Sequence, residues 1–584
     1  MPMGDTVKGG FTPRHGLVAA VVLMFGWVAW NRRWMTDDGY INIRVVEQWL
    51  AGNGAVFNAG ERVEVATSTL WLWLIALPSA VLPVEPSVIA VVLGWICAVS
   101  AAVVAALGSL RFARRAGLEA ASSFPLPLGL LVMVGITQFS DFATSGLENG
   151  LTWLWMAVCF FGLAGHIGSE APAHRPLWLP VVLGLGWLVR PDAALYSAAF
   201  LCALIVMSRW SWRGLAASLG LAAVLPVAYQ VFRMGYYATA VPNTALAKNA
   251  DGSLWSFGLN YLWGLVRHYA LVVPIAILLL ALVVRVARLV RDGRWQAFWL
   301  LGATIGAALL HVVYITKVGG DFMFGRFLLA PIFAMILPLA VIPIRAEELR
   351  SWVGVGTSTM LVWTFYAGGT VQAQRFHGHG VQDERFIYTG WVPSGSTLRP
   401  WEWAGFSFYE HGFAVAKDRD RGERYFQEAD GRRVPVADGY DLVYTHNVMG
   451  IVSVVAGTEV IVIDNLGLAD PLAARMPLPT DKRVERVGHM GHPAEFRIAR
   501  YAAPTPDDSP QVQAARRVLE CGDVARLQRG ISDPLTPRLF WSNVVEAPRL
   551  TTLQIPRDPI AAEEQLCDSD GVEGVSIDAK EHAR

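Results

Sequence analysis

Long apolar runs separated by short polar loops dominate the first 369 residues of this 584-residue chain. A helix that crosses a bilayer needs about 20 mostly apolar residues. By this criterion the pattern predicts eleven membrane-spanning helices, over 15–31, 87–110, 125–140, 148–166, 177–190, 193–208, 214–233, 260–285, 297–317, 326–344 and 351–369. The fold class predicted for residues 1–369 is therefore a polytopic α-helical membrane bundle.

A further apolar run, 67–83, is interpreted from the charges of the loops around it. Short cytoplasmic loops are enriched in Lys and Arg. Eleven spans and a cytoplasmic N-terminus place the arginines within 111–115 and 285–294 inside, whereas a twelfth span over 67–83 would move the first cluster outside. We therefore expect 67–83 to be re-entrant or interfacial, and the region after the last span to be extracytoplasmic.

Residues 370–584 have the pattern of a separate domain, in which short strands alternate with Gly, Asp and Pro turns. Strands are predicted at 433–436, 441–444, 451–455 and 458–463, and the spacing of apolar residues predicts a helix over 509–530. We expect a mixed α/β, β-rich domain that ends in an acidic and partly disordered tail, 558–584.

Composition supports this division of the chain. With 54% hydrophobic and only 16% charged residues, it is too apolar for an ordinary soluble protein. The net charge of zero argues against a generically basic nucleic-acid binder. It is the sum of two opposite parts, because residues 1–369 carry 24 basic and 17 acidic residues (+7) and residues 370–584 carry 24 and 31 (−7).

Cysteine positions agree with an outer C-terminal domain. Three of the five cysteines lie within predicted spans, and Cys521 and Cys567 lie in the C-terminal region. Because extracytoplasmic compartments are oxidising, we expect these two to form a disulfide, the alternative being two free thiols.

Charged residues collect at the predicted outer ends of the spans, where carboxylates near the bilayer are functional candidates. The acids are Asp37, Asp38, Asp141, Glu148, Asp192 and Asp321, and the basic candidates are Arg190, Lys248 and Arg326. Adjacent like charges repel, so one carboxyl of the Asp37-Asp38 pair should have a raised pKa, which suits acid/base chemistry. Alternatively, acids outside and bases inside only fix the topology, and Lys248 is a solvated loop residue.

The loop after the first span carries the clearest family signal. It contains the Asp37-Asp38-Gly39 run, a helical apolar spacing over 40–50, then Gly52-Asn53-Gly54, Phe57-Asn58, the run 60–64 (Gly-Glu-Arg-Val-Glu) and Thr67-Ser68-Thr69. This arrangement resembles the GT-C glycosyltransferases, which use polyprenyl-phosphate sugars. Within them it resembles the terminal β-(1→2)-arabinofuranosyltransferases of actinobacterial cell walls, most densely over 30–75 and 317–331.

The resemblance implies a donor, an acceptor and a catalytic acid. The donor would be decaprenylphosphoryl arabinofuranose, and the acceptor the non-reducing end of an arabinan on arabinogalactan, with lipoarabinomannan as an alternative carrier. The catalytic acid maps to Asp37, with Asp38 beside it, and Glu148, Asp192 and Asp321 are additional site acids. A carboxylate would take the proton of the acceptor hydroxyl.

Cations would stabilise the leaving phosphate, and the candidates are Arg190, Lys248, Arg326 and His377. Trp391, Trp401 and Trp403 are candidates for stacking on the acceptor, the alternative being that these aromatic residues dock the domain onto the bundle. No Cys, His or Asp spacing matches a metal site, so no cofactor is assigned and a divalent cation is left open.

Other functions are weighed against this one. A different GT-C enzyme, such as one resembling protein mannosyltransferases, would use another polyprenyl-phosphate sugar. A lipid-sugar transporter should show inverted repeats and ionisable residues at mid-span, whereas here the charges lie at helix ends and no internal repeat is evident.

Overall fold

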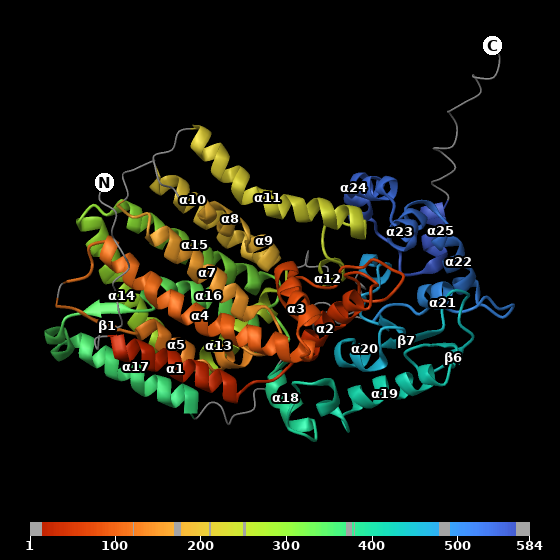
Figure 1. The fold of residues 1–584 in the computed structure, drawn as a ribbon, viewed down its shortest axis with the longest axis horizontal. Coiled ribbons are helices and arrows are strands. Elements are labelled where there is room, and N and C mark those ends of the chain that lie inside the picture. The colour runs from red at the N-terminus through yellow and green to blue at the C-terminus, as the bar shows by residue number, and fades with distance from the viewer. Residues whose placement is uncertain are drawn as a thin grey trace, which may run out of the picture.

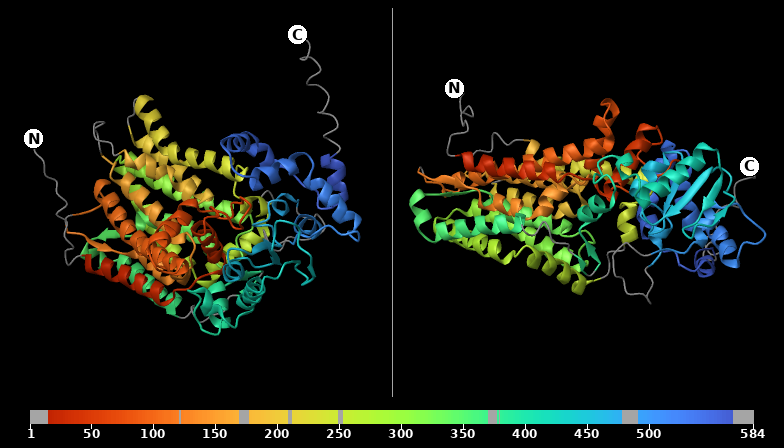
Figure 2. Two further views of the ribbon diagram at one scale, coloured as in Figure 1. Left: turned by 45° about the vertical axis from the view of Figure 1, so that its right-hand side comes forward. Right: turned by 90° about the horizontal axis from the view of Figure 1, so that it is seen from below.

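The computed structural model describes residues 15–120, 122–168, 177–208, 212–248, 253–369, 377–378 (backbone only), 380–477 and 491–567. A bundle of long helices forms one end of the molecule and the C-terminal region forms the other, with α2 and α3 between them (Figure 1). Seen from below, the molecule is elongated, and the sheet lies in the C-terminal part (Figure 2). The predicted fold class, a helical bundle followed by a mixed α/β region, is confirmed.

Most predicted spans correspond to helices of the bundle. These are α1 (Gly16–Asn31), α4 (Pro86–Arg115), α7 (Asn149–Ala164), α10 (Ala194–Met207), α11 (Trp212–Tyr237), α14 (Val272–Arg291), α15 (Trp295–Lys317) and α17 (Trp352–Gly369). Within the described residues, four helices are long and apolar enough to cross a membrane by length and composition alone: α4, α11, α14 and α15. The total of eleven spans stays a prediction.

Several predicted spans are interrupted. Residues 260–285 divide between α13 (Trp255–His268) and α14, because Ala270 has a φ of 47° that breaks the helix. The segment 177–190 divides into α8 (Trp178–Gly184) and α9 (Gly186–Val189). An apolar run shows burial but not where the backbone leaves the helix, so these breaks were missed.

Two further predicted spans contain strands. Residues 125–140 contain β1 (Phe124–Leu126), α5 (Leu128–Gly135) and α6 (Thr137–Phe142), and residues 326–344 contain η4 (Arg326–Leu328), α16 (Leu329–Ile336), η5 (Leu337–Leu339) and β2 (Ile342–Ile344). β1 pairs antiparallel with β2, so these two extended segments satisfy part of each other's backbone hydrogen bonding.

Two helices after α1 lie at one end of the bundle, next to the C-terminal part. They are α2 (Asp37–Leu50) and α3 (Thr69–Val81). At the start of α3 the Trp71 indole donates to the Gly146 carbonyl (2.9 Å), and within the N-terminal half of α4 Trp95 donates to the Gly26 carbonyl of α1 (2.8 Å). The interpretation of 67–83 as re-entrant or interfacial stays a prediction.

The C-terminal part holds a four-stranded sheet of order β6-β5-β7-β8. Its strands are β5 (Tyr425–Gln427), β6 (Arg433–Val434), β7 (Leu442–His446) and β8 (Ile461–Asp464), with β5, β7 and β8 parallel. Its helices are α18 (Glu384–Trp391), α19 (Ser407–Asp420), α20 (Gly450–Ala456), α21 (Glu495–Tyr501), α22 (Pro510–Leu519), α23 (Gly522–Ser532), α24 (Pro537–Thr552) and α25 (Pro559–Cys567).

The predicted strand at 451–455 is wrong, because this β-branched run forms α20, the crossover that joins two parallel strands. Helices predominate over strands, so "β-rich" overstates the sheet. The helix predicted over 509–530 is two helices that meet at Cys521, which forms the expected disulfide with Cys567. The tail beyond Cys567 lies outside the described residues.

The loop between α2 and α3 joins the bundle to the C-terminal part. Asn58 extends the edge of β8, since its amide donates to the Val462 carbonyl and accepts from the Val462 N–H, both at 3.0 Å. Buried Arg44 donates to the Ser453 and Val460 carbonyls (3.1 and 2.8 Å). Much of the sequence motif at 44–64 therefore fixes the position of the C-terminal region.

Candidate active site

Charged side chains from segments far apart in the sequence meet at the end of the bundle that faces the C-terminal part. They are Asp38 in the first turn of α2, Glu148 just before α7, Arg190 and Asp192 around the 3₁₀ helix η3 (Pro191–Ala193), Lys248 at the end of α12 (Asn243–Lys248), and Asp321 and Arg326 after α15. The sequence placed these groups at outer helix ends, and the structure brings them into one cluster.

Arg326 lies at the centre of this cluster. Its guanidinium is 3.7 Å from the Asp38 carboxylate and 3.8 Å from those of Glu148 and Asp321. These distances exceed those of a direct hydrogen bond, and the buried Nε atom has no hydrogen-bond partner among the residues that the structure describes. Arg326 therefore keeps donors that an anionic ligand could use.

Arg190 is held more tightly. It donates to Glu148 at 2.5 Å and makes a two-pronged interaction with Asp192 at 2.9 and 3.0 Å. The guanidinium groups of Arg190 and Arg326 each lie 5.4 Å from the centre of the Phe327 ring, so this ring positions both cations. Of the two, Arg326 is the better placed to bind a substrate.

Lys248 belongs to the same cluster. Burial raises the pKa of Asp321, and the positive charges of Arg326 and Lys248 oppose that rise. The short helix that carries Lys248 is fixed by Asn243, whose amide donates to the Gly467 and Leu468 carbonyls (3.1 and 2.9 Å). The C-terminal part thus positions a cation of the site.

The two neighbouring aspartates have different environments. Asp37 is buried, and its carboxylate accepts hydrogen bonds from the backbone N–H groups of Gly450 (3.2 Å) and Ile451 (2.8 Å) at the start of α20. Burial raises its pKa to about 7, against the effect of these two amides. The Asp38 side chain is 33% exposed and faces Arg326. Asp38 is therefore the member of the pair that a substrate could reach.

Sequence reasoning missed Glu384, which begins α18. Its carboxylate accepts a hydrogen bond from the Thr36 hydroxyl at 2.7 Å. Burial raises its pKa well above the usual value, and the negative charges of Asp38 and Asp37 add to this effect. An Asp-Glu pair shortly after the last apolar run was the only signal in the sequence.

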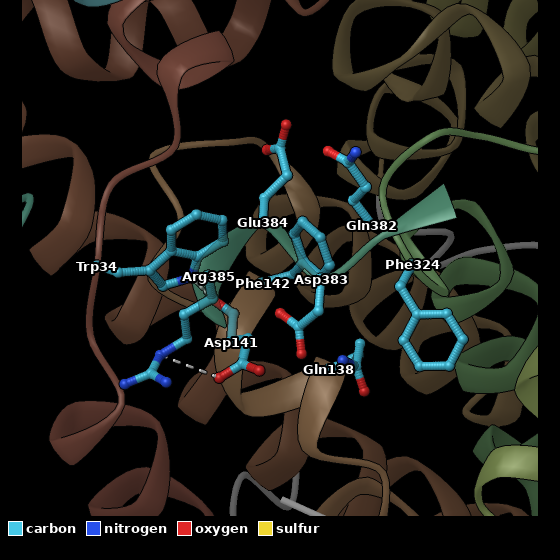
Figure 3. Close-up of a pocket in the computed structure, with 9 residues that line it drawn as sticks. All are labelled: Trp34, Gln138, Asp141, Phe142, Phe324, Gln382, Asp383, Glu384 and Arg385. Carbon is cyan, nitrogen blue, oxygen red and sulfur yellow. Dashed lines mark hydrogen bonds and ion pairs between the residues drawn. The ribbon is translucent and has the colours of Figure 1, made fainter. Parts of the chain in front are cut away.

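A narrow crevice adjoins the cluster (Figure 3). Trp34 and Phe324 lie on opposite sides of it in this view, and Glu384 belongs both to its lining and to the surroundings of the aspartate pair. Asp141 anchors one wall by ion pairs with Arg32 (2.6 Å) and Arg385 (3.5 Å). Carboxylate, amide and aromatic groups therefore lie side by side next to the charged cluster.

The predicted aromatic platform is corrected in part. Trp403 is fully buried, with its ring against Tyr40 and Tyr388 and its indole N–H donating to the Thr397 carbonyl. It packs the C-terminal part onto α2 and cannot stack on a sugar. Trp391 and Trp401 are 64% and 56% exposed.

The predicted donor-binding residue His377 lies in β3 (His377–Gly378), but its side chain is outside the described residues. For a metal, no group of three or more His, Cys, Asp or Glu side chains is arranged to hold an ion in the part of the chain that the structure describes. The carboxylates of Asp38, Glu148 and Asp321 surround a guanidinium, which occupies the position that a cation would need. These residues do not fit a divalent cation.

The fold and the site define an integral membrane protein with a charged, partly buried reaction centre between its helical bundle and a mixed α/β region. The terminal β-(1→2)-arabinofuranosyltransferase of Corynebacterium glutamicum is 32% identical over 600 residues, covering 91% of this chain and 85% of the relative. That of Mycobacterium tuberculosis is 31% identical over 619 residues, covering 93% and 95%. The chain belongs to the terminal β-(1→2)-arabinofuranosyltransferase family, and is therefore a glycosyltransferase, as its sequence indicated.

Two further comparisons concern parts of the chain and its fold. Residues 418–565 match the family model described as the AftB family C-terminal domain. Crystal structures of ArnT from Cupriavidus metallidurans, bound to undecaprenyl phosphate and in the apo state, are 16% identical. Each comparison covers 83% of this chain and 79% of the other, with TM-scores of 0.41 and 0.37.

Proposed function

We propose that this protein transfers arabinofuranose from decaprenylphosphoryl arabinofuranose to the non-reducing ends of cell-wall arabinan, and forms terminal β-(1→2) linkages. Membership in the arabinofuranosyltransferase family along nearly the whole chain carries the proposal. Arabinogalactan is the expected carrier of the arabinan, with lipoarabinomannan as a second one. The bilayer holds the lipid donor at the end of the bundle where the charged cluster lies.

The proposal assigns different roles to the charged groups. Arg326, whose donors are not fully used, binds the phosphate and stabilises the charge that develops as the sugar leaves. Lys248 adds a second positive charge, and Arg190 holds Glu148 and Asp192 in place. The active site and residues 370–584 face the extracytoplasmic side, with the N-terminus in the cytoplasm, as the loop charges predict.

Within the aspartate pair, Asp38 acts on the substrate, and Asp37 holds Asp38 in position. Asp38 is accessible and lies beside Arg326, so it can take the proton of the acceptor hydroxyl while the phosphate leaves toward the arginine. Asp37 is hydrogen-bonded to α20 and holds the first turn of α2 against the C-terminal part. This assignment replaces the one that the family resemblance suggested from position alone.

Reconstituted protein tests the activity. Purified protein in liposomes is offered decaprenylphosphoryl arabinose or a polyprenyl-phosphate mannose, with a short arabinan acceptor. We expect product from the arabinose donor only, with a new β-(1→2) linkage by NMR, which also reports the stereochemical course. Product from the mannose donor alone would contradict the proposal.

Variants test the roles of the two aspartates. Asp38→Asn should lower kcat at least 100-fold, in line with the loss of a general base, without lowering the melting temperature. Asp37→Asn should lower the melting temperature and reduce activity less. Asp441→Asn, at an exposed carboxylate of the C-terminal part, is the matched control and should change neither. A dead but stable Asp37→Asn beside an active Asp38→Asn would reverse the assignment.

A further inference from the structure

One edge of the C-terminal sheet faces the reaction centre. Since β7 and β8 are parallel and paired in register, with His446 opposite Asp464, their carboxyl ends lie side by side. In open α/β sheets, ligands bind outside the carboxyl ends of such strands. The proposed function leaves this edge without a role.

The segments that leave this edge contact neighbours of the charged cluster at two points. Gly450 and Ile451, a few residues after β7, donate their N–H groups to Asp37. Gly467 and Leu468, just after β8, accept hydrogen bonds from Asn243 at the base of the helix that carries Lys248. The carboxyl edge of the sheet therefore packs against the end of the bundle that carries Asp37 and the helix of Lys248.

Neutral polar side chains are presented at this edge. The amides of exposed Asn447 and half-buried Asn465, one after each strand, are hydrogen-bonded to each other at 2.9 Å. The imidazoles of half-buried His446 and exposed His411 form a second pair at 3.0 Å. The His446 ring also stacks on that of Tyr444, with centroids 5.8 Å apart. Two polar pairs thus stand next to an aromatic face.

The reach of the chain places this group close to the reaction. Asn447 precedes Gly450 by three residues, so its Cα lies no more than about 11 Å from that of the glycine bound to Asp37. A group at this distance is suited to contact a sugar residue next to the reacting one, rather than the reacting hydroxyl.

We propose that the carboxyl edge of β7 and β8 is a subsite for the arabinan acceptor, in which Asn447, Asn465 and the His411–His446 pair bind the sugar residues that precede the reacting end. This inference rests on the proposed function and adds the acceptor site to it. Amides offer both donors and acceptors without charge, which matches the hydroxyls of a neutral polysaccharide. The proposed donor site relies on the cations Arg326 and Lys248, whereas this edge offers uncharged amides.

Acceptor kinetics test the subsite. In the reconstituted full-length protein, the double variant N447A/N465A should raise the KM for a long arabinan oligosaccharide about tenfold. The KM for the lipid donor and the kcat with a short acceptor should stay unchanged. Gln513→Ala, at an exposed amide of α22, is the matched control. His411→Ala on the exposed face of α19 is a second variant, expected to act in the same direction should the double variant misfold.

Binding without turnover separates this inference from the proposed function. Saturation-transfer NMR of an arabinan oligosaccharide with wild-type protein in nanodiscs should show contacts that N447A/N465A loses. Such a loss supports the subsite even if the donor proves to be another polyprenyl sugar. Unchanged saturation transfer and unchanged acceptor KM in folded N447A/N465A and His411→Ala would overturn it.

Discussion

The start of α20 touches the aspartate pair so closely that one methyl group should disturb catalysis. A Cβ at position 450 would lie 2.0 Å from the Asp37 backbone oxygen and 2.6 Å from its Oδ1 atom. No flexible side-chain end can yield there, because the nearest atom is backbone. Gly450→Ala must therefore push α20 away from α2 and break both hydrogen bonds to the Asp37 carboxylate.

The expected size of the effect follows from these contacts. Hydrogen bonds to a charged group contribute about 1.5–3 kcal/mol each. Because burial brings the pKa of Asp37 to about 7, the carboxylate is only partly ionised at neutral pH, so we expect a total loss of roughly 2–4 kcal/mol. A misplacement of about 1 Å near the reacting atoms can cost roughly 100-fold in rate, so kcat should fall by about that factor.

The assay compares Gly450→Ala with Gly390→Ala, whose added methyl group meets no atom within 4 Å. Melting temperature in detergent and initial rates with the arabinose donor are measured for both. Gly390→Ala should match the wild type, and the donor KM of Gly450→Ala should change little, since Arg326 lies on the bundle. A Gly450→Ala protein with normal kcat and stability would show that the contact between α20 and Asp37 does not support the site.

Three further predictions concern other parts of the molecule. Phe327→Ala removes the ring beneath both guanidinium groups, each contact contributing about 0.5–1 kcal/mol, so the donor KM should rise roughly 5- to 30-fold; an unchanged donor KM would contradict it. Burial raises the pKa of Asp37 and of Asp464 to about 7, so the stability from their protonated forms is complete below about pH 4 and is lost as the pH rises through 7. The melting temperature should be higher at pH 5.5 than at pH 8, by a smaller margin in Asp37→Asn; equal margins would exclude Asp37. Removing the Cys521–Cys567 bridge by Cys521→Ser should cost about 3–4 kcal/mol and speed limited proteolysis near α25 while leaving kcat unchanged, which peptide mapping and initial rates check.

The hydrophobic pattern predicts the bundle well because burial in a bilayer demands continuous apolar runs. It fails where the chain stays apolar but changes conformation. Nothing in the composition of 260–285 marks the break at Ala270, and the β-branched run 451–455 has strand propensity but forms a crossover helix. Local preference was overridden there by the need to join two parallel strands.

The sequence could predict that the charged side chains of the site lie together, because the Lys and Arg residues of the loops indicate which helix ends lie on the same side of the membrane. The division of labour between Asp37 and Asp38 could not. The groups that engage Asp37 are 413 and 414 residues away in the sequence and are backbone amides, which no motif identifies. Glu384 and the Asn447–Asn465 pair were missed for the same reason, since the packing of the C-terminal part alone sets their positions.

Because the reaction centre depends on contacts with residues remote in the sequence, the C-terminal part has a structural role in the site. Asp37 is fixed by α20, and the helix of Lys248 is fixed by the loop after β8. The first turn of α2 and the helix α12 therefore take their positions from the region after residue 370. Arg44 and Asn58 reinforce the same interface from the bundle side. A domain that only captured acceptor could be attached by a tether, whereas here its sheet edge supplies the groups that hold the reaction centre together. The sheet edge proposed to bind the acceptor is thus the same element that fixes Asp37 and the helix of Lys248, so a sugar bound there would lie against the supports of the reaction centre.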